Sequence, residues 1–299
     1  MTRFVQQEIA SQPECWREVA RIARGAEVRD RLPRPGARVA VVGCGTSCFM
    51  AQSFAALREG SGAGETDAFP ASEFPLGRDY EHVVAVTRSG TTTEVLRVLE
   101  RLPGGARSTV ITTGEQLPAA ALATDTVALP FADERSVVQT RFATTALALW
   151  RAWLGEDVAA LADAAVRVAG AELPDGLAEA RQFTFVGQGW AAGIAHEAAL
   201  KAREAAQLWT ESYPAMELRH GPISVLALGS VAWLFGSPPP GLLADLQATG
   251  ARVVSSDEDA MVDLVRAQRV AVAAAEHRGL DPDAPRNLTR SIVLDGEPW

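Results

Sequence analysis

Two short segments of the sequence carry the groups that bind a phosphate. Gly43–Ser47 (GCGTS) and Thr87–Thr92 (TRSGTT) combine glycines with small hydroxyl side chains, and each follows an apolar run. A strand-to-helix turn of this kind presents free backbone N–H groups and the partial positive charge of a helix N-terminus. Two such turns in one open parallel sheet would lie at the carboxyl ends of strands, where ligands bind. The segments indicate an anion site, with simple helix capping by serine and threonine as the alternative.

Neither segment is a nucleotide signature. A Walker A motif needs GxxxxGK[ST], and a dinucleotide fingerprint needs a third glycine where this chain has Cys48. Cys44 lies in the first turn, where a helix N-terminus can lower a thiol pKa and create a nucleophile. No histidine is close to Cys44 in the sequence, so a small packing residue is the favoured interpretation.

A second group of chemically capable residues lies in the segment HEAALKAREAAQLWTESYPAMELRHGP, residues 196–222. Glu197, Lys201 and Glu204 are spaced i, i+4 and i+7, so they share one face of a predicted helix. Spacing alone is typical of an ion-pair ladder on a helix surface. His220 ends the next predicted helical piece, and a lone histidine there is commonly structural or exposed.

The elements that would position these residues alternate between strand and helix. Residues 1–30 predict a helical segment, and the periodicity then changes to short apolar runs separated by helical patterns. Expected strands lie at 37–43, 83–86, 108–112, 126–130, 183–187, 231–236 and 251–256, and a helical stretch covers 142–171. Alternation of this kind predicts parallel sheets covered by helices on both faces.

The chain restarts its own pattern after Pro174, Asp175 and Gly176. FTFVGQGWAAGIAHEAALKARE is similar in design to VAVVGCGTSCFMAQSFAALRE, with a strand, a glycine turn and a helix. We therefore predict an N-terminal helical segment (1–30) and two related halves (31–165 and 166–299). Only the first half has a hydroxyl-rich loop, since the corresponding loop of the second half is SPPPG. Phosphate binding is thus expected in the first half.

Composition narrows the class of protein. The net charge of −9 and the pI near 5.1 argue against general nucleic-acid binding. The three cysteines form no CxxC pair, and no HExxH occurs, so neither a disulfide framework nor a metal site is expected. The N-terminus is polar, and no apolar run reaches the roughly 18 residues of a membrane span. These features predict a cytoplasmic protein that binds no membrane.

The motifs GCGTS, SGTTTE, ALKxxE, ELRHGP and DPDAPRNLTRS together resemble the double sugar-isomerase (SIS) domain family over nearly the whole chain. They are similar to the isomerase domain of glucosamine-6-phosphate synthase, and more so to glutaminase-free aminosugar-phosphate deaminase/isomerases. The resemblance implies an α/β fold of two SIS-type three-layer α/β/α halves, each a mainly parallel sheet flanked by helices. It also implies a reaction that needs no cofactor.

The resemblance implies a role for individual residues as well. Glu204 matches the carboxylate that moves a proton between C1 and C2 of the sugar. His220 matches a histidine that assists ring opening in the active site of the other subunit, which implies a homodimer with shared sites. The loop Val137–Arg141 matches one that touches the sugar. The implied substrate contacts are Cys44, Gly45, Thr46, Ser47, Thr87, Arg88, Ser89, Thr92, Val137, Gln139, Glu197 and Arg290, with Ser47, Thr87, Ser89 and Thr92 as the main phosphate contacts.

The chain departs from the synthase pattern at three places. Arg88 stands where the synthase has glutamine, and Arg290 stands where it has a lysine. Arginine keeps the charge but forms no imine and does not act as a base. The chain also starts Met-Thr-Arg without the glutaminase half, so we expect it not to release ammonia from glutamine.

The leading functional hypothesis is an aminosugar-phosphate deaminase/isomerase that acts on a hexosamine 6-phosphate resembling glucosamine 6-phosphate. The alternatives are an aldose–ketose phosphosugar isomerase and a fructosamine-phosphate deglycase. A non-catalytic sugar-phosphate sensor is a further alternative, because a fold alone does not prove catalysis.

Overall fold

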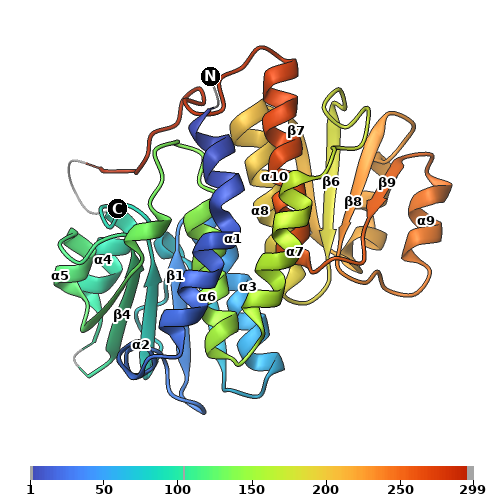
Figure 1. The fold of residues 1–299 in the computed structure, drawn as a ribbon. Coiled ribbons are helices and arrows are strands. Elements are labelled where there is room, and N and C mark those ends of the chain that lie inside the picture. Colours follow the sequence, from blue (N-terminus) through green and yellow to red (C-terminus); the bar gives the residue numbers. More distant parts are fainter. Residues whose placement is uncertain (1–2, 104, 295–299) are drawn as a thin grey trace.

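The structure is a computed structural model that describes residues 3–103 and 105–294 of the 299-residue chain. It contains two parallel sheets with a layer of helices between them (Figure 1). The strands of the first sheet have the order β2-β1-β3-β4-β5, where the elements are β1 (Val39–Gly43), β2 (Thr66–Pro70), β3 (His82–Val86), β4 (Arg107–Thr112) and β5 (Asp125–Ala128).

The second sheet repeats this arrangement with one strand fewer. Its order is β7-β6-β8-β9, where the strands are β6 (Gln182–Gly187), β7 (Trp209–Pro214), β8 (Ser230–Phe235) and β9 (Arg252–Ser255). In both sheets the first strand of the half lies next to the edge, with the second strand outside it and the third strand on its inner side. The direction of winding therefore reverses between β1 and β3, and again between β6 and β8.

Helices cover both faces of each sheet. The layer between the sheets consists of α1 (Phe4–Ala23), α3 (Thr46–Gly60), α6 (Arg141–Trp153), α7 (Val158–Gly170), α8 (Ala191–Ala206) and α10 (Ala260–His277). The outer faces carry α4 (Thr93–Arg101) and α5 (Pro118–Leu122) on the first sheet and α9 (Leu242–Ala248) on the second. The short helix α2 (Ala26–Arg31) precedes β1.

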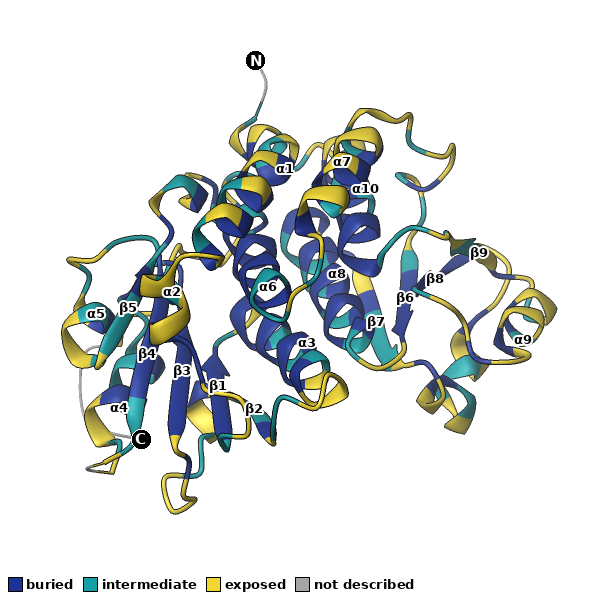
Figure 2. Ribbon diagram, turned by 60° about the horizontal axis from the view of Figure 1, so that its bottom comes forward, coloured by how far each residue is buried: buried dark blue, intermediate teal, exposed yellow. Residues whose placement is uncertain are grey.

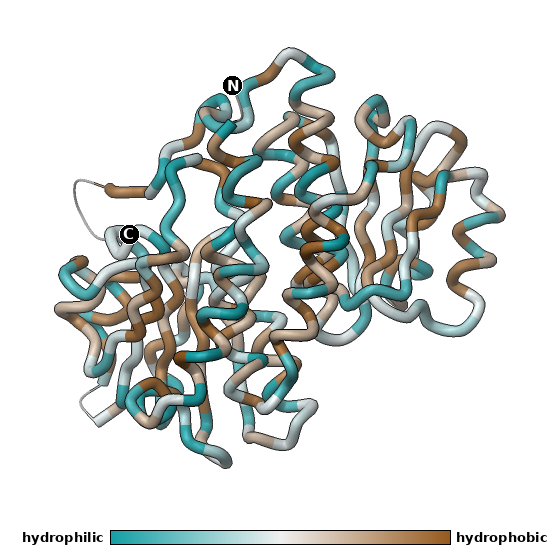
Figure 3. Tube along the Cα trace, in the orientation of Figure 1, coloured by the Kyte–Doolittle hydropathy of each residue, from teal (hydrophilic) through white to brown (hydrophobic). Residues whose placement is uncertain are grey.

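Alternation along the strands explains these layers. Val39, Val41 and Phe185 face a single large core that also contains the inner helices, whereas Ala40 and Val42 face a smaller outer core under α4. Among the inner helices, α6, α8 and α10 are buried along most of their length, whereas α1 and α7 have an exposed face (Figure 2). The strands are among the most hydrophobic parts of the chain (Figure 3). Burying both faces of a parallel sheet requires such continuous apolar strands.

The predicted α/β architecture is confirmed, and its details differ in two respects. The edge strands β2 and β7 were not expected, because TDAFP and WTESYP are polar, end in proline and are only partly buried. The helical stretch 142–171 consists of two helices, separated by a turn in which Gly155 has a positive φ of 94°. The domain boundaries at 30 and 165 stay predictions.

The segment after α10 returns to the first half of the molecule (Figure 1). Asp283 accepts hydrogen bonds from the backbone N–H groups of Phe4 (2.9 Å) and Val5 (2.7 Å) at the start of α1. Further along, the carbonyl of Ile292 accepts a hydrogen bond from the N–H of Thr93 at the start of α4 (3.1 Å). We call residues 284–294 the C-terminal segment. Across the described residues, no helix is both long and apolar enough to cross a membrane.

Candidate active site

A pocket of about 200 Å³ lies beside the carboxyl ends of β1 and β3, where the winding of the first sheet reverses. Reversal points of this kind are the usual ligand sites of open α/β sheets. The pocket is lined by Cys44, Gly45, Thr46, Ser47, Val86, Thr87, Arg88, Ser89, Thr92, Val95, Val137, Gln139, Glu204, Leu288, Thr289, Arg290, Ser291 and Ile292.

The first hydroxyl-rich loop depends on its glycines. A Cβ atom on Gly43 would lie 2.8 Å from the backbone of Ser47, and Gly45 has a positive φ of 53°. The turn is therefore tight enough to place Thr46 and Ser47 at the N-terminus of α3 and beside the pocket. A helix N-terminus favours an anion through its free N–H groups and its dipole.

The second hydroxyl-rich loop enters α4 in the same way. The hydroxyl of Thr87 accepts a hydrogen bond from the N–H of Gly90 (3.2 Å), and that of Ser89 accepts one from the N–H of Thr91 (3.2 Å). Within the described structure, neither N-cap residue, Gly45 for α3 or Thr92 for α4, makes a side-chain capping bond. Only Thr92 tests the capping alternative, because Gly45 has no side chain, and the Thr92 hydroxyl does not cap α4; this favours the anion-site interpretation for the second loop.

The carboxylates and the lysine of α8 are not a surface ladder. Glu197 and Lys201 are fully buried, and only Glu204 is partly exposed, with 19% of its side chain accessible. The Lys201 ammonium donates a hydrogen bond to the Thr46 hydroxyl (2.9 Å) and one to the Glu204 carboxylate, and it lies 3.5 Å from Glu197. Packing of α3 against α8 thus joins the first hydroxyl-rich loop to the carboxylates.

Burial disfavours the charged forms of both Glu197 and Lys201, but the neighbouring charges make the net effect on their protonation different. It raises the pKa of Glu197 to about 8, and the Lys201 ammonium only partly offsets it, so Glu197 holds a proton at neutral pH. Burial disfavours the charged form of Lys201 too, but the carboxylates of Glu197 and Glu204 outweigh it and raise the lysine pKa. Lys201 is therefore a fixed cation beside Glu204.

Of the three expected site residues in the segment 196–222, only one lines the pocket. Glu204 lines the pocket, whereas Glu197 lies behind Lys201 and is not among the described lining residues. His220 is also outside the pocket within its own chain, in the exposed 3₁₀ turn η3 (Glu217–His220). The remaining expected contacts, from Cys44 to Arg290, all line the pocket.

Cys44 is a weak candidate nucleophile. It lines the pocket, but burial raises the pKa of its thiol to about 12, and Glu94 acts in the same direction. A protonated thiol is a poor nucleophile. The packing interpretation is therefore favoured. Among the described residues, no group of three histidine, cysteine or acidic side chains could hold a metal ion.

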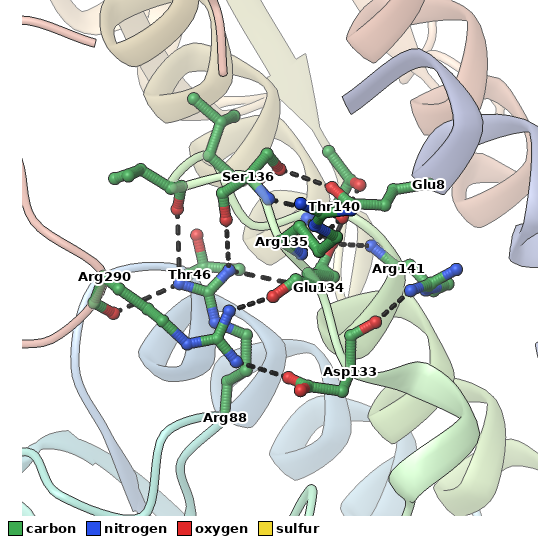
Figure 4. Close-up of polar contacts among 12 residues, drawn as sticks. Glu8, Thr46, Arg88, Asp133, Glu134, Arg135, Ser136, Thr140, Arg141 and Arg290 are labelled. Atoms are coloured by element: carbon green, nitrogen blue, oxygen red, sulfur yellow. Dashed lines mark hydrogen bonds and ion pairs between the residues drawn. The ribbon is translucent and has the colours of Figure 1, made fainter. Parts of the chain in front are cut away.

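Arg88 is buried and bonded to protein groups from two other segments (Figure 4). It donates hydrogen bonds to the carbonyl oxygens of Ser136 (3.2 Å), Val137 (3.3 Å) and Arg290 (3.1 Å). Its guanidinium also lies 3.5 Å from the Glu134 carboxylate. Burial lowers the pKa of Arg88, and the nearby Glu134 opposes that change.

The C-terminal segment covers the second hydroxyl-rich loop. The Ser291 hydroxyl accepts hydrogen bonds from the hydroxyls of Ser89 and Thr91, both at 3.0 Å. Of the C-terminal segment, the sequence predicts only Arg290 as a site residue. It assigns no role to Lys201 on α8. The spacing of Lys201 from Glu204 was visible in the sequence, whereas nothing in the sequence places Ser291 beside residues 89–92.

Gln139 offers a free donor at the pocket. Its side-chain nitrogen is buried and has no hydrogen-bond partner among the described residues. A buried polar group without a partner is costly, which suggests a role for a ligand. The loop from 134 to 139 is thus the third wall of the site.

Comparisons with known proteins agree with this arrangement. No protein-family model matches the chain. A glutamine–fructose-6-phosphate aminotransferase (isomerizing) of Pyrobaculum aerophilum is 31% identical over 152 residues, which are 42% of this chain and 25% of that protein. The corresponding protein of Sulfolobus acidocaldarius is 25% identical over 339 residues, with 98% of this chain and 57% of that protein covered. The chain thus spans between a quarter and somewhat over half of these relatives.

Solved structures match over nearly the whole chain. Glucosamine-6-phosphate deaminase from Thermotoga maritima has a TM-score of 0.81 at 23% identity, and 98% of this chain and all of that chain are covered. Tagatose-6-phosphate ketose/aldose isomerase from Escherichia coli has a TM-score of 0.79 at 20% identity, with 99% and 97% covered. The C-terminal domain of the Francisella tularensis aminotransferase has a TM-score of 0.80 at 19% identity, with 95% and 98% covered.

At these identities the structural matches establish the fold, and the sequence matches establish common ancestry. The chain is therefore homologous to the SIS isomerase domain of the glutamine–fructose-6-phosphate aminotransferases, and it has the SIS-like α/β fold of the phosphosugar isomerases.

Proposed function

We propose that this chain is a phosphosugar enzyme and, more narrowly, an aminosugar-phosphate deaminase/isomerase that acts on a hexosamine 6-phosphate. One observation carries the proposal. Lys201 bonds both to Thr46 at the helix N-terminus of the anion site and to Glu204, which faces the same pocket. The phosphate-binding loops and a proton-transferring carboxylate would then contact the same small molecule.

The phosphate would lie between the N-termini of α3 and α4. Ser47, Thr87, Ser89 and Thr92 line that part of the pocket, as expected from the sequence, and a phosphate oxygen can accept hydrogen bonds from each hydroxyl. Ser291 now bonds to two hydroxyls of that loop, so we place it beside the phosphate as well.

Glu204 would carry the proton. In the open-chain amino aldose, its carboxylate takes the proton from C2 while O1 gains a proton from water, which leaves an enolamine. The carboxylate then returns the C2 proton to C1 while the amine nitrogen loses a proton to water. The product is a 2-imino ketose phosphate. Addition of water at C2 and loss of ammonia then give the ketose phosphate. Lys201 remains a cation throughout and keeps the Glu204 carboxylate oriented.

We further propose a homodimer in which His220 completes the site of the partner subunit. His220 lies outside the pocket of its own chain, and its segment exposes Met216, Val225 and Leu228, with 46%, 51% and 92% of their surface accessible. Apolar side chains exposed around a polar one are typical of a surface that another molecule covers. We also propose that the two halves are a repeat, since their sheets share one winding order.

Two enzymatic alternatives remain close to this proposal. An aldose–ketose isomerase without nitrogen is favoured by the match to the E. coli tagatose-6-phosphate isomerase fold. A fructosamine-phosphate deglycase would use the same proton transfer. A sugar-phosphate sensor would use the hydroxyl loops but would not need the Lys201–Glu204 pair.

A substrate panel separates these functions. Purified protein is incubated with glucosamine 6-phosphate, galactosamine 6-phosphate, fructose 6-phosphate plus ammonia, and fructoselysine phosphate, and ammonia and ketose are measured. The proposal expects both products from a hexosamine 6-phosphate. Thermal stabilisation by a phosphosugar without any turnover would instead establish the sensor.

A further inference from the structure

We propose that Arg88 and Glu134 form a positioning pair that holds the loop 134–139 and the C-terminal segment over the hydroxyl-rich loops. In this proposal Arg88 acts through protein groups, and the phosphate is bound without it. The effect on catalysis rests on the proposed function, whereas the effect on the C-terminal segment does not.

The first argument is that both terminal nitrogens of Arg88 already donate to protein groups. Its two terminal nitrogens donate to three carbonyl oxygens, two from the loop 134–139 and one from the C-terminal segment. The planar fork of a guanidinium suits such multiple contacts in a way that a lysine does not. Figure 4 shows Arg88 between the residues of that loop and Arg290.

The second argument is the burial of Glu134. The side chain is fully buried, and its Oε1 accepts hydrogen bonds from Thr140 N (2.6 Å), Thr140 Oγ1 (3.0 Å) and Arg141 N (2.6 Å) at the start of α6. Its Oε2 makes no hydrogen bond to a described residue and faces Arg88 at 3.5 Å. A buried charge needs a counter-charge, so each member of the pair requires the other.

Further contacts fix the same loop from both sides. Glu8 of α1, also buried, accepts hydrogen bonds from the N–H groups of Arg135 (2.5 Å) and Ser136 (3.3 Å) and from the Ser136 hydroxyl. On the other side, Arg290 donates to the Glu134 carbonyl and to the Asp133 carboxylate. The C-terminal segment is therefore tied to the loop through two arginines.

The charge balance explains why Arg88 need not bind the phosphate. Glu134 compensates its charge, and its hydrogen bonds point to carbonyl oxygens of the protein. The hydroxyls of Ser47 and Thr87 and the helix N-termini remain as neutral donors for the anion. Arg88 would therefore set the position of the pocket walls, and through them the fit of the sugar.

The direct test compares Arg88→Gln with wild type in the ligand-free protein. Hydrogen exchange is measured at the amides of Thr93, which bonds to Ile292, and of Leu294, which bonds to the Thr93 hydroxyl. Loss of the pair should speed exchange of both by about tenfold or more, since local opening sets that rate. Arg101→Gln, an equal charge change at an exposed position of α4, should leave both rates unchanged.

The second readout separates positioning from phosphate binding. The Kd of inorganic phosphate, from competition against the phosphosugar in a thermal-shift titration, should change less than about twofold in Arg88→Gln. In the same variant, kcat/KM for the phosphosugar should fall by about 10- to 100-fold, because misplaced walls weaken transition-state contacts. Arg88→Lys should keep the charge pair and recover only part of the loss. Glu134→Gln should change exchange and kinetics in the direction of Arg88→Gln.

Unchanged hydrogen exchange in Arg88→Gln would overturn the proposal. A tenfold loss of phosphate affinity would also overturn it, because Arg88 would then be a phosphate ligand. If Arg88→Gln does not fold, Arg88→Lys and Glu134→Gln decide the same question through the same readouts. If wild type turns over no sugar of the panel, the proposed function fails. The exchange and phosphate measurements still test the pair in that case.

Discussion

The Nζ of Lys201 lies 2.9 Å from the Thr46 hydroxyl and bonds to the Glu204 carboxylate on its other side. One buried cation thereby fixes the distance between a helix N-terminus of the first half and a carboxylate of the second. Because a substrate would have to contact both, the predictions begin with this contact.

Glu204→Gln should reduce kcat by about 10²–10⁴-fold, since the amide cannot accept the proton from C2. The amide keeps the shape of the side chain, so the Kd of the phosphosugar should change by less than about threefold. Steady-state kinetics and calorimetric titration measure the two quantities. The exposed Glu179→Gln serves as the control and should match wild type. Full activity of Glu204→Gln would remove Glu204 from the mechanism.

Lys201→Met should destabilise the fold by about 3–5 kcal/mol, because it leaves the Glu204 carboxylate without its counter-charge. Urea unfolding, monitored by the fluorescence of the buried tryptophans, measures the free energy of unfolding. Adding Glu204→Gln should restore part of the loss, since the double variant removes the uncompensated carboxylate. A Lys201→Met protein as stable as wild type would show that the charges are not coupled.

Acidification should destabilise the fold through His82. Burial beside Arg107 lowers the pKa of His82 from about 6.5 to about 4, and its Nε2 lies 2.7 Å from the Thr109 hydroxyl. Between these pH values His82 is protonated in the unfolded chain and neutral in the folded chain, so the free energy of unfolding falls as the pH drops through that range. The lost free energy amounts to about 3 kcal/mol.

The control for that effect is a comparison of variants. His82→Gln should lose the part of the pH dependence between pH 6.5 and 4, whereas the exposed His277→Gln should retain it. Glu197 acts with the opposite sign, because its raised pKa makes protonation stabilising as the pH falls from about 8. Urea titrations at several pH values separate the effects of His82 and Glu197. If the free energy of unfolding changes with pH equally in His82→Gln and in wild type, the assignment to His82 is refuted.

Mixing inactive variants tests the shared site. Each mixed dimer of His220→Ala and Glu204→Gln would contain one site with both groups intact. Random exchange of subunits at equal concentrations should therefore restore about a quarter of wild-type activity. Native mass spectrometry of isotope-labelled chains verifies that mixed dimers form, and no recovery in their presence would exclude sharing.

The sequence predicted every strand that has an apolar run, including the edge strands β5 and β9, and it missed the edge strands β2 and β7. β2 and β7 are half-exposed, so their polar side chains gave no strand pattern. The hydroxyl loops were visible because glycine, serine and threonine cluster directly after strands. The resemblance to the SIS family added Glu204, which spacing alone assigned to a surface ladder, and His220, which alone was interpreted as a structural or exposed histidine.

Contacts between distant segments could not be predicted in this way. The pairing of Arg88 with Glu134 depends on how the loop before α6 packs against α1, and no local pattern encodes that. The burial of Lys201 likewise follows from the packing of α3 on α8. A helical face of Glu, Lys and Glu looks the same in the sequence whether water or protein covers it.

The return of the C-terminal segment also determines when the site can exist during synthesis. The pocket combines Cys44 and Thr46 with Glu204 and Ile292, and Asp283 supplies the acceptor for the first N–H groups of α1. A nascent chain therefore displays the hydroxyl loops long before the ribosome has made the residues that close them. The proposed phosphosugar would have no complete site on the growing chain, so its binding would stabilise this protein only after the two sheets and their helices have packed together.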